Sequence, residues 1–261
     1  MGARPGNYAE QARTYDYTRG ASPTIVRAVA KPLGPPGGVL LDIAGGTGNY
    51  AQVFQARGFD VVVLDASSEM LAHAKRKLRP PAKVVAGDAE RLPFRDAVGH
   101  AAVIVNAIHL IQDVDHAFRE ARRVLRDGPL VLTAFTKENL AALFVYEYFG
   151  LGVPITPRPP AEAIASQLRG AGFSRVRHEP FVYTDTVDGS LNALHTDALR
   201  LAGPAYLRNT SFWHRIDEET RRTGLEALAR DLRTGVLERR VRESFRVAAE
   251  HGHGTVFAAW P

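Results

Sequence analysis

The sequence predicts an α/β fold in which a doubly wound, mostly parallel sheet of seven strands carries an N-terminal cap and a helical insertion before the last strand. Three observations predict it. Short, almost continuously apolar runs alternate with helical patterns over residues 39–135, which is typical of a parallel sheet covered by helices on both faces. A glycine-rich turn follows the first of these runs. An alternating, apolar run at 255–260 supplies a last strand.

Each element follows from local spacing. Apolar, often β-branched runs predict strands, and apolar residues repeated every three to four positions between them predict helices. The expected strands are 39–43, 60–64, 83–86, 100–105, 130–135, 173–177 and 255–260. The expected helices include 50–57, 114–125 and 161–170. A further helix is expected between the second and third strands, where Ser67 or Ser68 can cap it and one face carries Met70, Leu71, Ala74 and Leu78.

Residues 182–250 interrupt the sheet pattern and are expected to be helical. Asp217 has the side chain of a helix N-cap, and two glutamates follow it in the first turn. Leu225, Leu228 and Leu232 then form an apolar stripe, which Gly235 ends.

Composition excludes several classes of protein. The 261 residues include no cysteine, so disulfides, a thiolate nucleophile and cysteine-ligated metals are excluded. No histidine and acid spacing resembles a metal site. No stretch approaches ~18 consecutive apolar residues, and no secretion signal is visible at the N-terminus, so we expect a cytoplasmic protein without a membrane span.

The net charge of +5 raises the question of nucleic acid as a partner. The basic residues are 28 arginines and 5 lysines, and they do not cluster. From Arg208 to Arg246, ten arginines are interleaved with seven acids, as on a solvated helix face. We therefore do not expect nucleic acid as a partner, while the oligomeric state stays open.

The strongest local signal is the glycine-rich segment 41–50, Leu-Asp-Ile-Ala-Gly-Gly-Thr-Gly-Asn-Tyr. Glycines between a strand and a helix let a ligand approach the backbone, and the helix N-terminus favours negative charge. Asp65 ends the second strand, where an acid can accept both hydroxyls of a ribose. The loop and Asp65 together predict a cofactor that contains a nucleoside.

Residues 46–51 also fit the dinucleotide pattern G-x-G-x-x-G/A, so an NAD-binding oxidoreductase is one alternative. Three features argue against NAD. Asp42 precedes the turn and would repel a pyrophosphate. Asp88 follows the third strand, where it can accept from an adenine amino group. No Tyr-x-x-x-Lys constellation for nicotinamide chemistry is found.

The motifs of the first half of the chain resemble those of the class I S-adenosylmethionine-dependent methyltransferases, in particular the small-molecule branch that includes ubiquinone/menaquinone C-methyltransferase-like proteins. The segments that carry the resemblance stand in the family's order and spacing, and they are 41–48, 63–71, 87–94 and 123–128. The resemblance implies a Rossmann-like fold, S-adenosylmethionine as the cofactor, and methyl transfer to an O, N or C atom of an organic small molecule by in-line displacement. Ala44 departs from the family, which usually has its first glycine there; we expect a negative φ at this residue, so that the loop keeps its shape.

The resemblance also implies which residues meet the cofactor. Those expected at its methionine portion are Asp42, Ala44, Gly45, Gly46, Gly48 and, through its carbonyl, Asn106. Those expected at its adenosine portion are Asp65 on the ribose and Ala66, Met70, Asp88 and Ala89 around adenine. In the N-terminal cap, Tyr15 is expected near the sulfonium and Arg19 on the carboxylate, with lid packing and a solvated arginine as the alternative.

The resemblance divides the chain into three parts. Residues 1–38 form the cap, residues 39–181 and 251–261 form the cofactor-binding unit, and residues 182–250 form a helical insertion that binds the substrate.

Methyl transfer needs a general base only if the acceptor must lose a proton. The candidate base is His109, which follows the fourth strand at the edge of the sheet where ligands bind; a role in ordering the loop is the alternative. His195 and His214 are weaker candidates, whereas His251 and His253 are interpreted as turn residues.

Aromatic side chains recur in two segments that leave the same edge of the sheet. Core packing is the simpler explanation of their spacing, and an aromatic-lined substrate pocket is the alternative. They are Phe144, Tyr146, Tyr148 and Phe149, and then Tyr206, Phe212 and Trp213. A cofactor-binding protein that no longer methylates, such as a cyclase or a regulatory binder, is a further alternative for the whole chain.

Overall fold

A computed structural model describes residues 15–151 and 158–261. It contains one sheet of seven strands in the order β3-β2-β1-β4-β5-β7-β6. The strands are β1 Val39–Ile43, β2 Asp60–Asp65, β3 Lys83–Ala86, β4 Ala101–Val105, β5 Leu130–Ala134, β6 Arg175–Phe181 and β7 Gly254–Trp260. The first five are parallel to one another, and β7 is antiparallel to both β5 and β6. The predicted fold class is confirmed.

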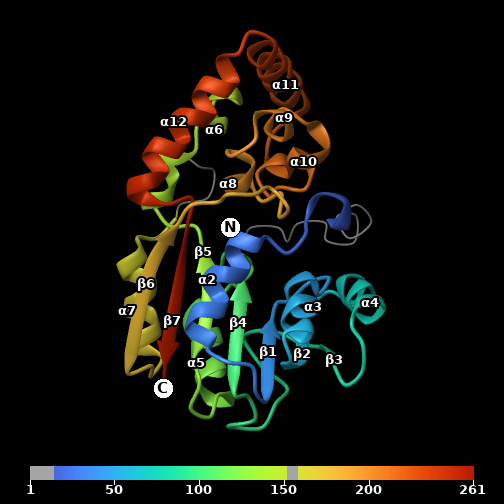
Figure 1. Ribbon diagram of the computed structural model, residues 1–261, viewed down its shortest axis with the longest axis vertical. Coiled ribbons are helices and arrows are strands. Elements are labelled where there is room, and N and C mark those ends of the chain that lie inside the picture. The colour runs from blue at the N-terminus through green and yellow to red at the C-terminus, as the bar shows by residue number, and fades with distance from the viewer. Residues whose placement is uncertain (1–14, 152–157) are drawn as a thin grey trace.

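Helices cover both faces of the sheet (Figure 1). Alternate residues of each strand point to opposite faces, so Leu41 joins the core beneath one helical layer and Leu40 joins the core beneath the other. One layer contains α5 Val114–Val124 and α7 Ala161–Gly170. The other contains α2 Pro23–Leu33, α3 Asn49–Ala56 and α4 Ser68–Lys77.

The capping predictions are confirmed where the structure tests them. Ser67 caps α4 and accepts a hydrogen bond from the Met70 amide at 3.2 Å. Asp217 caps α11 and accepts from the Thr220 amide at 2.7 Å. Strand six was placed too early, because Phe173 lies in the core before the strand begins at Arg175.

The second half of the chain adds a helical layer above the carboxyl ends of the parallel strands (Figure 1). Its core consists of aromatic and leucine side chains from two separate connections. The β5–α7 connection supplies η2 Glu138–Ala142 and α6 Val145–Tyr148. The β6–β7 connection supplies α8 Leu191–Leu194, α9 Ala198–Leu201, α10 Pro204–Arg208, η3 Trp213–Arg215, α11 Glu218–Arg233 and α12 Val236–His251. We call these two connections together the helical layer.

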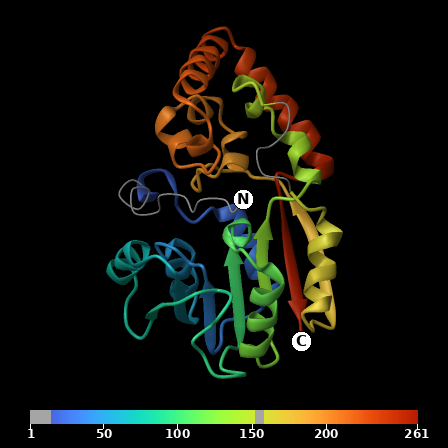
Figure 2. The ribbon, with the colours of Figure 1, turned by 180° about the vertical axis from the view of Figure 1, so that it is seen from behind.

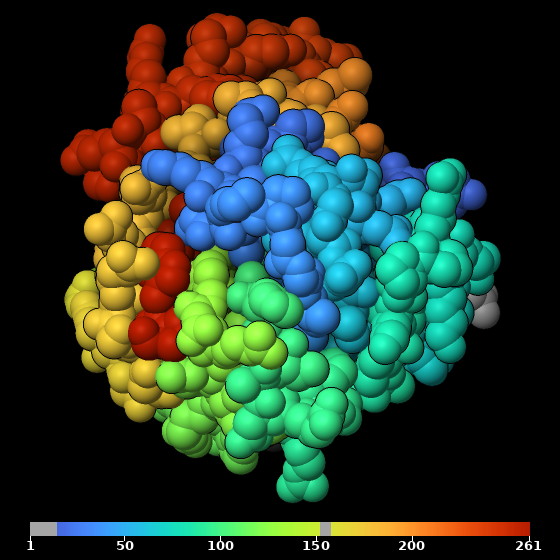
Figure 3. Space-filling model, turned by 60° about the horizontal axis from the view of Figure 1, so that its bottom comes forward, coloured from blue at the N-terminus to red at the C-terminus, as the bar shows by residue number. Residues whose placement is uncertain are grey.

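Seen from behind, the same helical layer again lies above the ends of the strands (Figure 2). In the space-filling view, N-terminal residues lie between the helical layer and the rest of the chain (Figure 3). The N-terminal residues include α2, which packs on β5 and β7 and belongs to the core on one face of the sheet. The exposed face of α11 carries the expected arginine and acid pairs, such as Arg222 with Glu219 and Glu226.

Candidate functional site

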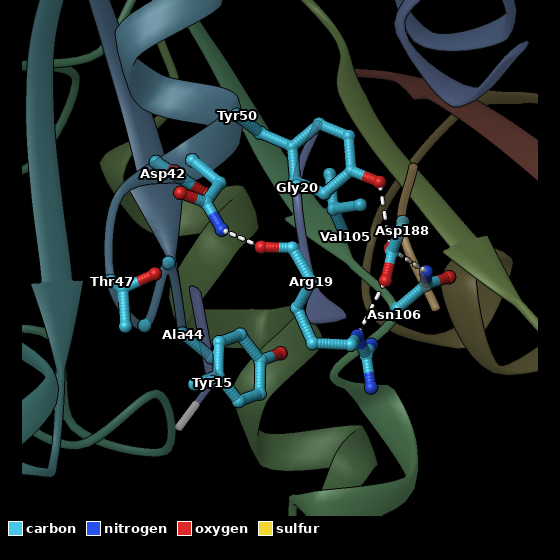
Figure 4. A pocket seen from close by; sticks show the side chains of 13 residues that line it. Tyr15, Arg19, Gly20, Asp42, Ala44, Thr47, Tyr50, Val105, Asn106 and Asp188 are labelled. Atoms are coloured by element: carbon cyan, nitrogen blue, oxygen red, sulfur yellow. Dashed lines mark hydrogen bonds and ion pairs between the residues drawn. The ribbon is translucent and has the colours of Figure 1, made fainter. Parts of the chain in front are cut away.

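A pocket opens at the carboxyl ends of β1 and β4 (Figure 4). These two strands are neighbours in the sheet, and the chain winds away from them in opposite directions, so a crevice forms between the connections that follow them. The pocket is lined from the N-terminal segment, the glycine-rich loop, the end of β4 and the helical layer. The lining residues are Tyr15, Arg19, Gly20, Asp42, Ala44, Gly45, Gly46, Thr47, Asn49, Tyr50, Val105, Asn106 and Asp188.

The glycine-rich loop runs from β1 into α3 as a tight turn. The Gly45 amide donates to the Leu64 carbonyl, and the Gly48 amide donates to the Gly45 carbonyl, both at 3.0 Å. A Cβ on Gly45 would lie 2.7 Å from the Asp42 carboxylate, whereas a Cβ on Gly46 would meet nothing within 4 Å. The Gly46 backbone is therefore open to a ligand.

The expectation of a negative φ at Ala44 is wrong. Its φ is +55°, in the left-handed region, where an L-residue with a side chain is disfavoured by about 1–2 kcal/mol. The loop keeps its turn hydrogen bonds in spite of this cost. The strain explains why a glycine suits this position, and Asn106, also at positive φ, is a residue type that tolerates it.

Asp42 is a buried carboxylate whose Oδ2 atom has no hydrogen-bond partner among the described residues. Burial, followed by the nearby charge of Asp65, raises the pKa of Asp42 to about 7. A buried carboxylate without a cation is costly. A cationic ligand in the pocket would satisfy this oxygen.

Asp65 organises the neighbouring turn. Its Oδ2 atom accepts from the Gly46 amide and its Oδ1 atom from the Ser67 amide, both at 2.8 Å. Burial raises the pKa of Asp65, and these backbone donors oppose the rise. The carboxylate thus joins the glycine-rich loop to the start of α4.

Asp188 is the centre of a polar network in the pocket (Figure 4). It accepts from Arg19 Nε at 2.5 Å, from the Tyr50 hydroxyl at 2.8 Å and from Asn106 Nδ2 at 3.1 Å. Burial opposes the charge on Arg19, but the Asp188 carboxylate outweighs it and raises the pKa of Arg19. The backbone of residues 18–20 also pairs with residues 187–189, so the N-terminal segment is tied to the helical layer.

A second polar cluster fixes the other end of the N-terminal segment. Lys77 Nζ contacts Asp16 Oδ1 and Asn49 Oδ1 at 2.6 Å and Thr47 Oγ1 at 3.0 Å. Asp16 also accepts from Thr47 Oγ1 at 2.9 Å. The segment that holds Tyr15 is therefore anchored to the glycine-rich loop through α4.

Comparisons with known proteins agree with this geometry. A family model described as a methyltransferase domain matches residues 41–133. A ubiquinone/menaquinone biosynthesis C-methyltransferase of Bradyrhizobium diazoefficiens is 33% identical over 204 residues, which span 66% of this chain and 78% of that protein. A demethylmenaquinone methyltransferase of Beutenbergia cavernae is 35% identical over 168 residues, which span 62% and 69%. The chain belongs to the class I S-adenosylmethionine-dependent methyltransferases.

Solved structures show the same fold. A proposed methyltransferase of an antibiotic biosynthesis pathway in Anabaena variabilis superposes with a TM-score of 0.78 at 24% identity, over 94% of this chain and 99% of that one. A phosphoethanolamine N-methyltransferase of Haemonchus contortus superposes with a TM-score of 0.59 at 17% identity, over 97% of this chain and 57% of that one. The family match and the sequence relatives together show that the chain uses S-adenosylmethionine as its cofactor and that its methyl acceptor is a small molecule.

The structure brings together part of the predicted cofactor set. The predicted residues that line the pocket are Tyr15, Arg19, Asp42, Ala44, Gly45, Gly46 and Asn106. Five others lie outside the lining. Four of them stand at the carboxyl ends of β2 and β3, along the same edge of the sheet, and Met70 lies in the first turn of α4; the four are Asp65, Ala66, Asp88 and Ala89. Gly48 is the N-cap of α3 at a φ of +74°, which favours glycine, and a Cβ there would also lie a close 3.1 Å from Ala74 Cβ.

His109 lies in η1 Ile108–Leu110, after the carboxyl end of β4 and outside the lining of this pocket. Burial, with added repulsion from three arginines, lowers the pKa of His109 to about 3. The side chain is therefore neutral at physiological pH but a weak proton acceptor.

The other histidines have structural surroundings. His195 is buried, its Nε2 atom accepts from the Val145 amide at 3.2 Å, and burial lowers its pKa to about 3. His214 contacts the Arg208 carbonyl at 2.9 Å. The interpretation of His253 as a simple turn residue is incomplete, because its side chain is fully buried and its Nδ1 atom accepts from the Tyr183 amide.

The aromatic residues pack on one another instead of lining the pocket. Phe149 contacts Phe212 and Trp213 with ring centroids 5.3 and 6.1 Å apart, and all three are buried. Phe144 lies edge-on to His195 at 4.8 Å. The simpler of the two explanations, core packing, is confirmed for the buried members.

Two residues that line the pocket were not predicted from the sequence to belong to the site. Tyr50 follows the glycine-rich loop at once, so its place in the first turn of α3 was a usable signal. Asp188 precedes a glycine and looks like an ordinary turn residue, so no local signal distinguished it.

Within residues 15–151 and 158–261, no helix is long and apolar enough to cross a membrane.

Proposed function

We propose that this chain binds S-adenosylmethionine in the pocket at the carboxyl ends of β1 and β4 and transfers its methyl group to an organic small molecule held beneath the helical layer. The observation that carries the assignment of the pocket is Asp42, a buried carboxylate with an oxygen that lacks a partner. The donor set fits the cofactor, because that oxygen suits an ammonium group and the open Gly46 backbone admits a chain of atoms beside it.

The roles proposed for individual residues follow from their places. Asp42 would hold the ammonium group of the methionine portion. Asp65, at the end of β2, would accept the ribose hydroxyls while it keeps its two backbone donors. Tyr15 would cover the methyl group, since Asp16 and Arg19 anchor the segment that directly follows it.

The contacts of Arg19 restrict how it would bind the carboxylate of the cofactor. Its Nε atom is engaged by Asp188, and its Nη1 atom lies 3.3 Å from the Asn209 carbonyl. Arg19 would therefore reach the carboxylate of the methionine portion only with its remaining N–H groups. Asp188 would act as a positioning residue that fixes the guanidinium.

When bound, the cofactor supplies a methyl group already activated on a sulfonium, so no covalent protein intermediate is required. The chain contributes orientation and exclusion of water, and positioning of this kind can lower a barrier by about 7–11 kcal/mol. The anchored N-terminal segment and the helical layer close the pocket from two sides. His109, neutral and close to the pocket, would orient the acceptor and accept a proton only weakly.

The test is cofactor binding by calorimetry with wild type and Asp65→Ala. We expect S-adenosylmethionine to bind, NAD not to bind, and the variant to weaken S-adenosylmethionine binding at least tenfold. Asp60→Asn, at the exposed start of the same strand, is the matched control and should bind as wild type. Unchanged affinity of Asp65→Ala would mean that the ribose assignment is wrong, and binding of NAD alone would overturn the function.

The acceptor class is tested by incubating the protein with labelled cofactor and a cell extract. Label in a low-mass product supports the proposal. Label in RNA or protein, or tight binding without transfer, would contradict it.

A further inference from the structure

Thr133 is the polar residue of an otherwise apolar strand. β5 has the sequence Leu-Val-Leu-Thr-Ala, and all five of its residues are buried. A buried hydroxyl is costly unless it is hydrogen-bonded. Valine has nearly the same shape and suits a buried strand at least as well. The hydroxyl at this position therefore indicates a role beyond packing.

The Thr133 hydroxyl forms hydrogen bonds with one residue, Asn106, which follows β4. It accepts from the Asn106 backbone amide at 3.0 Å and donates to the Asn106 Oδ1 atom at 2.9 Å. The pairing of β4 with β5 ends at Val105 and Thr133, so the next amide of the chain, that of Asn106, meets this side chain instead of a backbone carbonyl. The hydroxyl thus holds both the backbone and the side chain of Asn106.

Asp188 holds the Asn106 side chain from the other side. The Nδ2 atom of Asn106 donates to Asp188 Oδ2 at 3.1 Å, and both residues line the pocket (Figure 4). Asn106 has a φ of +52°, in the left-handed region, where residues with a side chain are disfavoured. Such a conformation persists only where the surrounding structure fixes it. At Asn106, Thr133 and Asp188 supply the contacts that fix it.

The backbone carbonyl of Asn106 accepts no hydrogen bond from the described residues. Asp42 lines the same pocket, and its Oδ2 atom likewise has no partner among them. The two oxygens belong to the carboxyl ends of β4 and β1, which are neighbours in the sheet. An ammonium group has three N–H donors and could satisfy both oxygens at once.

We propose that Thr133 is a positioning residue of the cofactor site. Its hydroxyl holds Asn106 in the left-handed conformation, in which the Asn106 carbonyl accepts, together with the Asp42 carboxylate, from the ammonium group of the methionine portion. The inference rests on the proposed function and adds a residue that lies outside the lining of the pocket. Binding groups are held precisely when hydrogen bonds from the residues behind them fix their conformation.

The test is binding of S-adenosylhomocysteine to the full-length protein, measured by calorimetry. Thr133→Val removes the hydroxyl and keeps the branched shape. It should weaken binding about tenfold, the lower end of what a hydrogen bond to a charged group contributes. Thr133→Ser keeps the hydroxyl and loses a buried methyl group, so it should bind much as wild type does although its melting temperature falls.

Thr255→Val is the matched control. Thr255 lies on β7, next to β5 in the sheet, and its buried hydroxyl donates to the Asn139 Oδ1 atom at 3.2 Å, but neither residue lines the pocket. Thr255→Val and Thr133→Val should both lower the melting temperature, because each removes a buried hydrogen bond. Only Thr133→Val should weaken binding.

Two further comparisons show whether Thr133 acts through Asn106 and on the ammonium group. Asn106→Gly removes the side chain that Thr133 holds, so it should weaken binding by a similar factor, and Thr133→Val should add little to it in the double variant. The deamino analogue of S-adenosylhomocysteine lacks only the ammonium group. It should bind wild type and Thr133→Val alike.

The inference fails if Thr133→Val binds as wild type, if Thr133→Ser or Thr255→Val loses as much affinity as Thr133→Val, or if the deamino analogue shows the same loss. Additive losses in the double variant would also contradict it. If Thr133→Val does not fold, Asn106→Gly decides, and wild-type affinity in that variant would overturn the inference. Failure of wild type to bind S-adenosylhomocysteine would instead overturn the proposed function, so the two failures are distinguishable.

Discussion

The two sides of the site differ in charge. On the side of β1 and β2, Asp42 and Asp65 are carboxylates whose pKa values burial raises, and Asp42 has an oxygen with no partner among the described residues. On the side of η1, burial lowers the pKa values of His109 and Arg158, and nearby arginines lower them further. A cationic methyl donor suits the first side, because it would compensate the charge of Asp42.

Asp188 joins the two sides of the site, and replacing it should have the largest effect, a fall in the free energy of unfolding. Asp188→Asn would leave Arg19 as a buried cation without its counterion, which costs about 3–5 kcal/mol. We expect a matching fall in the free energy of unfolding, measured by urea denaturation. The double variant Arg19→Met/Asp188→Asn should recover part of the loss. If the single variant is as stable as wild type, Asp188 does not hold the two sides together.

Asp42→Asn tests the acidic side directly. The variant keeps the shape of the side chain but removes the charge that the cofactor's ammonium group would meet. Hydrogen bonds to charged groups contribute about 1.5–3 kcal/mol, so we expect S-adenosylmethionine binding to weaken about 10–100-fold in calorimetry. Stability should not fall, since the variant removes a buried charge. An unchanged dissociation constant would place the ammonium group elsewhere.

The pH dependence of binding sharpens the same comparison. In the ligand-free protein, the Asp42 pKa of about 7 means that the carboxyl is largely protonated at pH 6, while a cationic ligand requires the charged form. Affinity should therefore rise about eightfold from pH 6 to pH 7.5, as the carboxyl ionises. Asp42→Asn should remove this dependence, and an equally steep profile in the variant would assign the titration to another group.

The same raised pKa has a consequence for stability. Between the unfolded value of about 4 and the folded value of about 7, the folded protein binds a proton that the unfolded chain does not. The contribution of Asp42 to the stability of the ligand-free protein therefore falls as the pH rises through this window.

Ala44→Gly should have the smallest effect. Glycine adopts a φ of +55° without strain, although it also loses more backbone freedom on folding. The net result should be a stabilisation of about 1 kcal/mol or less, seen as a small rise in melting temperature. A loss of stability would show that the methyl group of Ala44 contributes packing that outweighs the strain of its backbone.

Much of the sheet could be predicted from local patterns. Val39–Ile43 and Ala161–Gly170 have the predicted bounds, because apolar runs and helical spacing report burial directly. The predicted position of β6 was displaced toward the N-terminus, because the mostly exposed residues of this edge strand do not show the apolar pattern of a buried strand. The glycine-rich loop was recognised from its residues, but the positive φ of Ala44 was not, since backbone angles depend on how the turn meets β2.

The electrostatics of the site could not be predicted in this way. His195 and His253 gave no sign of burial, because each contacts residues from distant segments, Phe144 in the first case and Tyr183 in the second. Asp188 meets Arg19 across 169 positions of the chain. Arg158, His109 and Arg215 likewise come from three separate connections.

The sequence by itself determined the order of strands and helices, the glycine-rich loop and the acids at the strand ends, because each depends on neighbours within a few residues. Only the tertiary structure decided which charges are paired and which are not. Charge compensation depends on which segments the folded chain brings within a few ångströms, and the burial that makes an uncompensated charge costly exists only after folding. The buried carboxylate of Asp42, with an oxygen that has no partner among the described residues, is therefore a property of the fold.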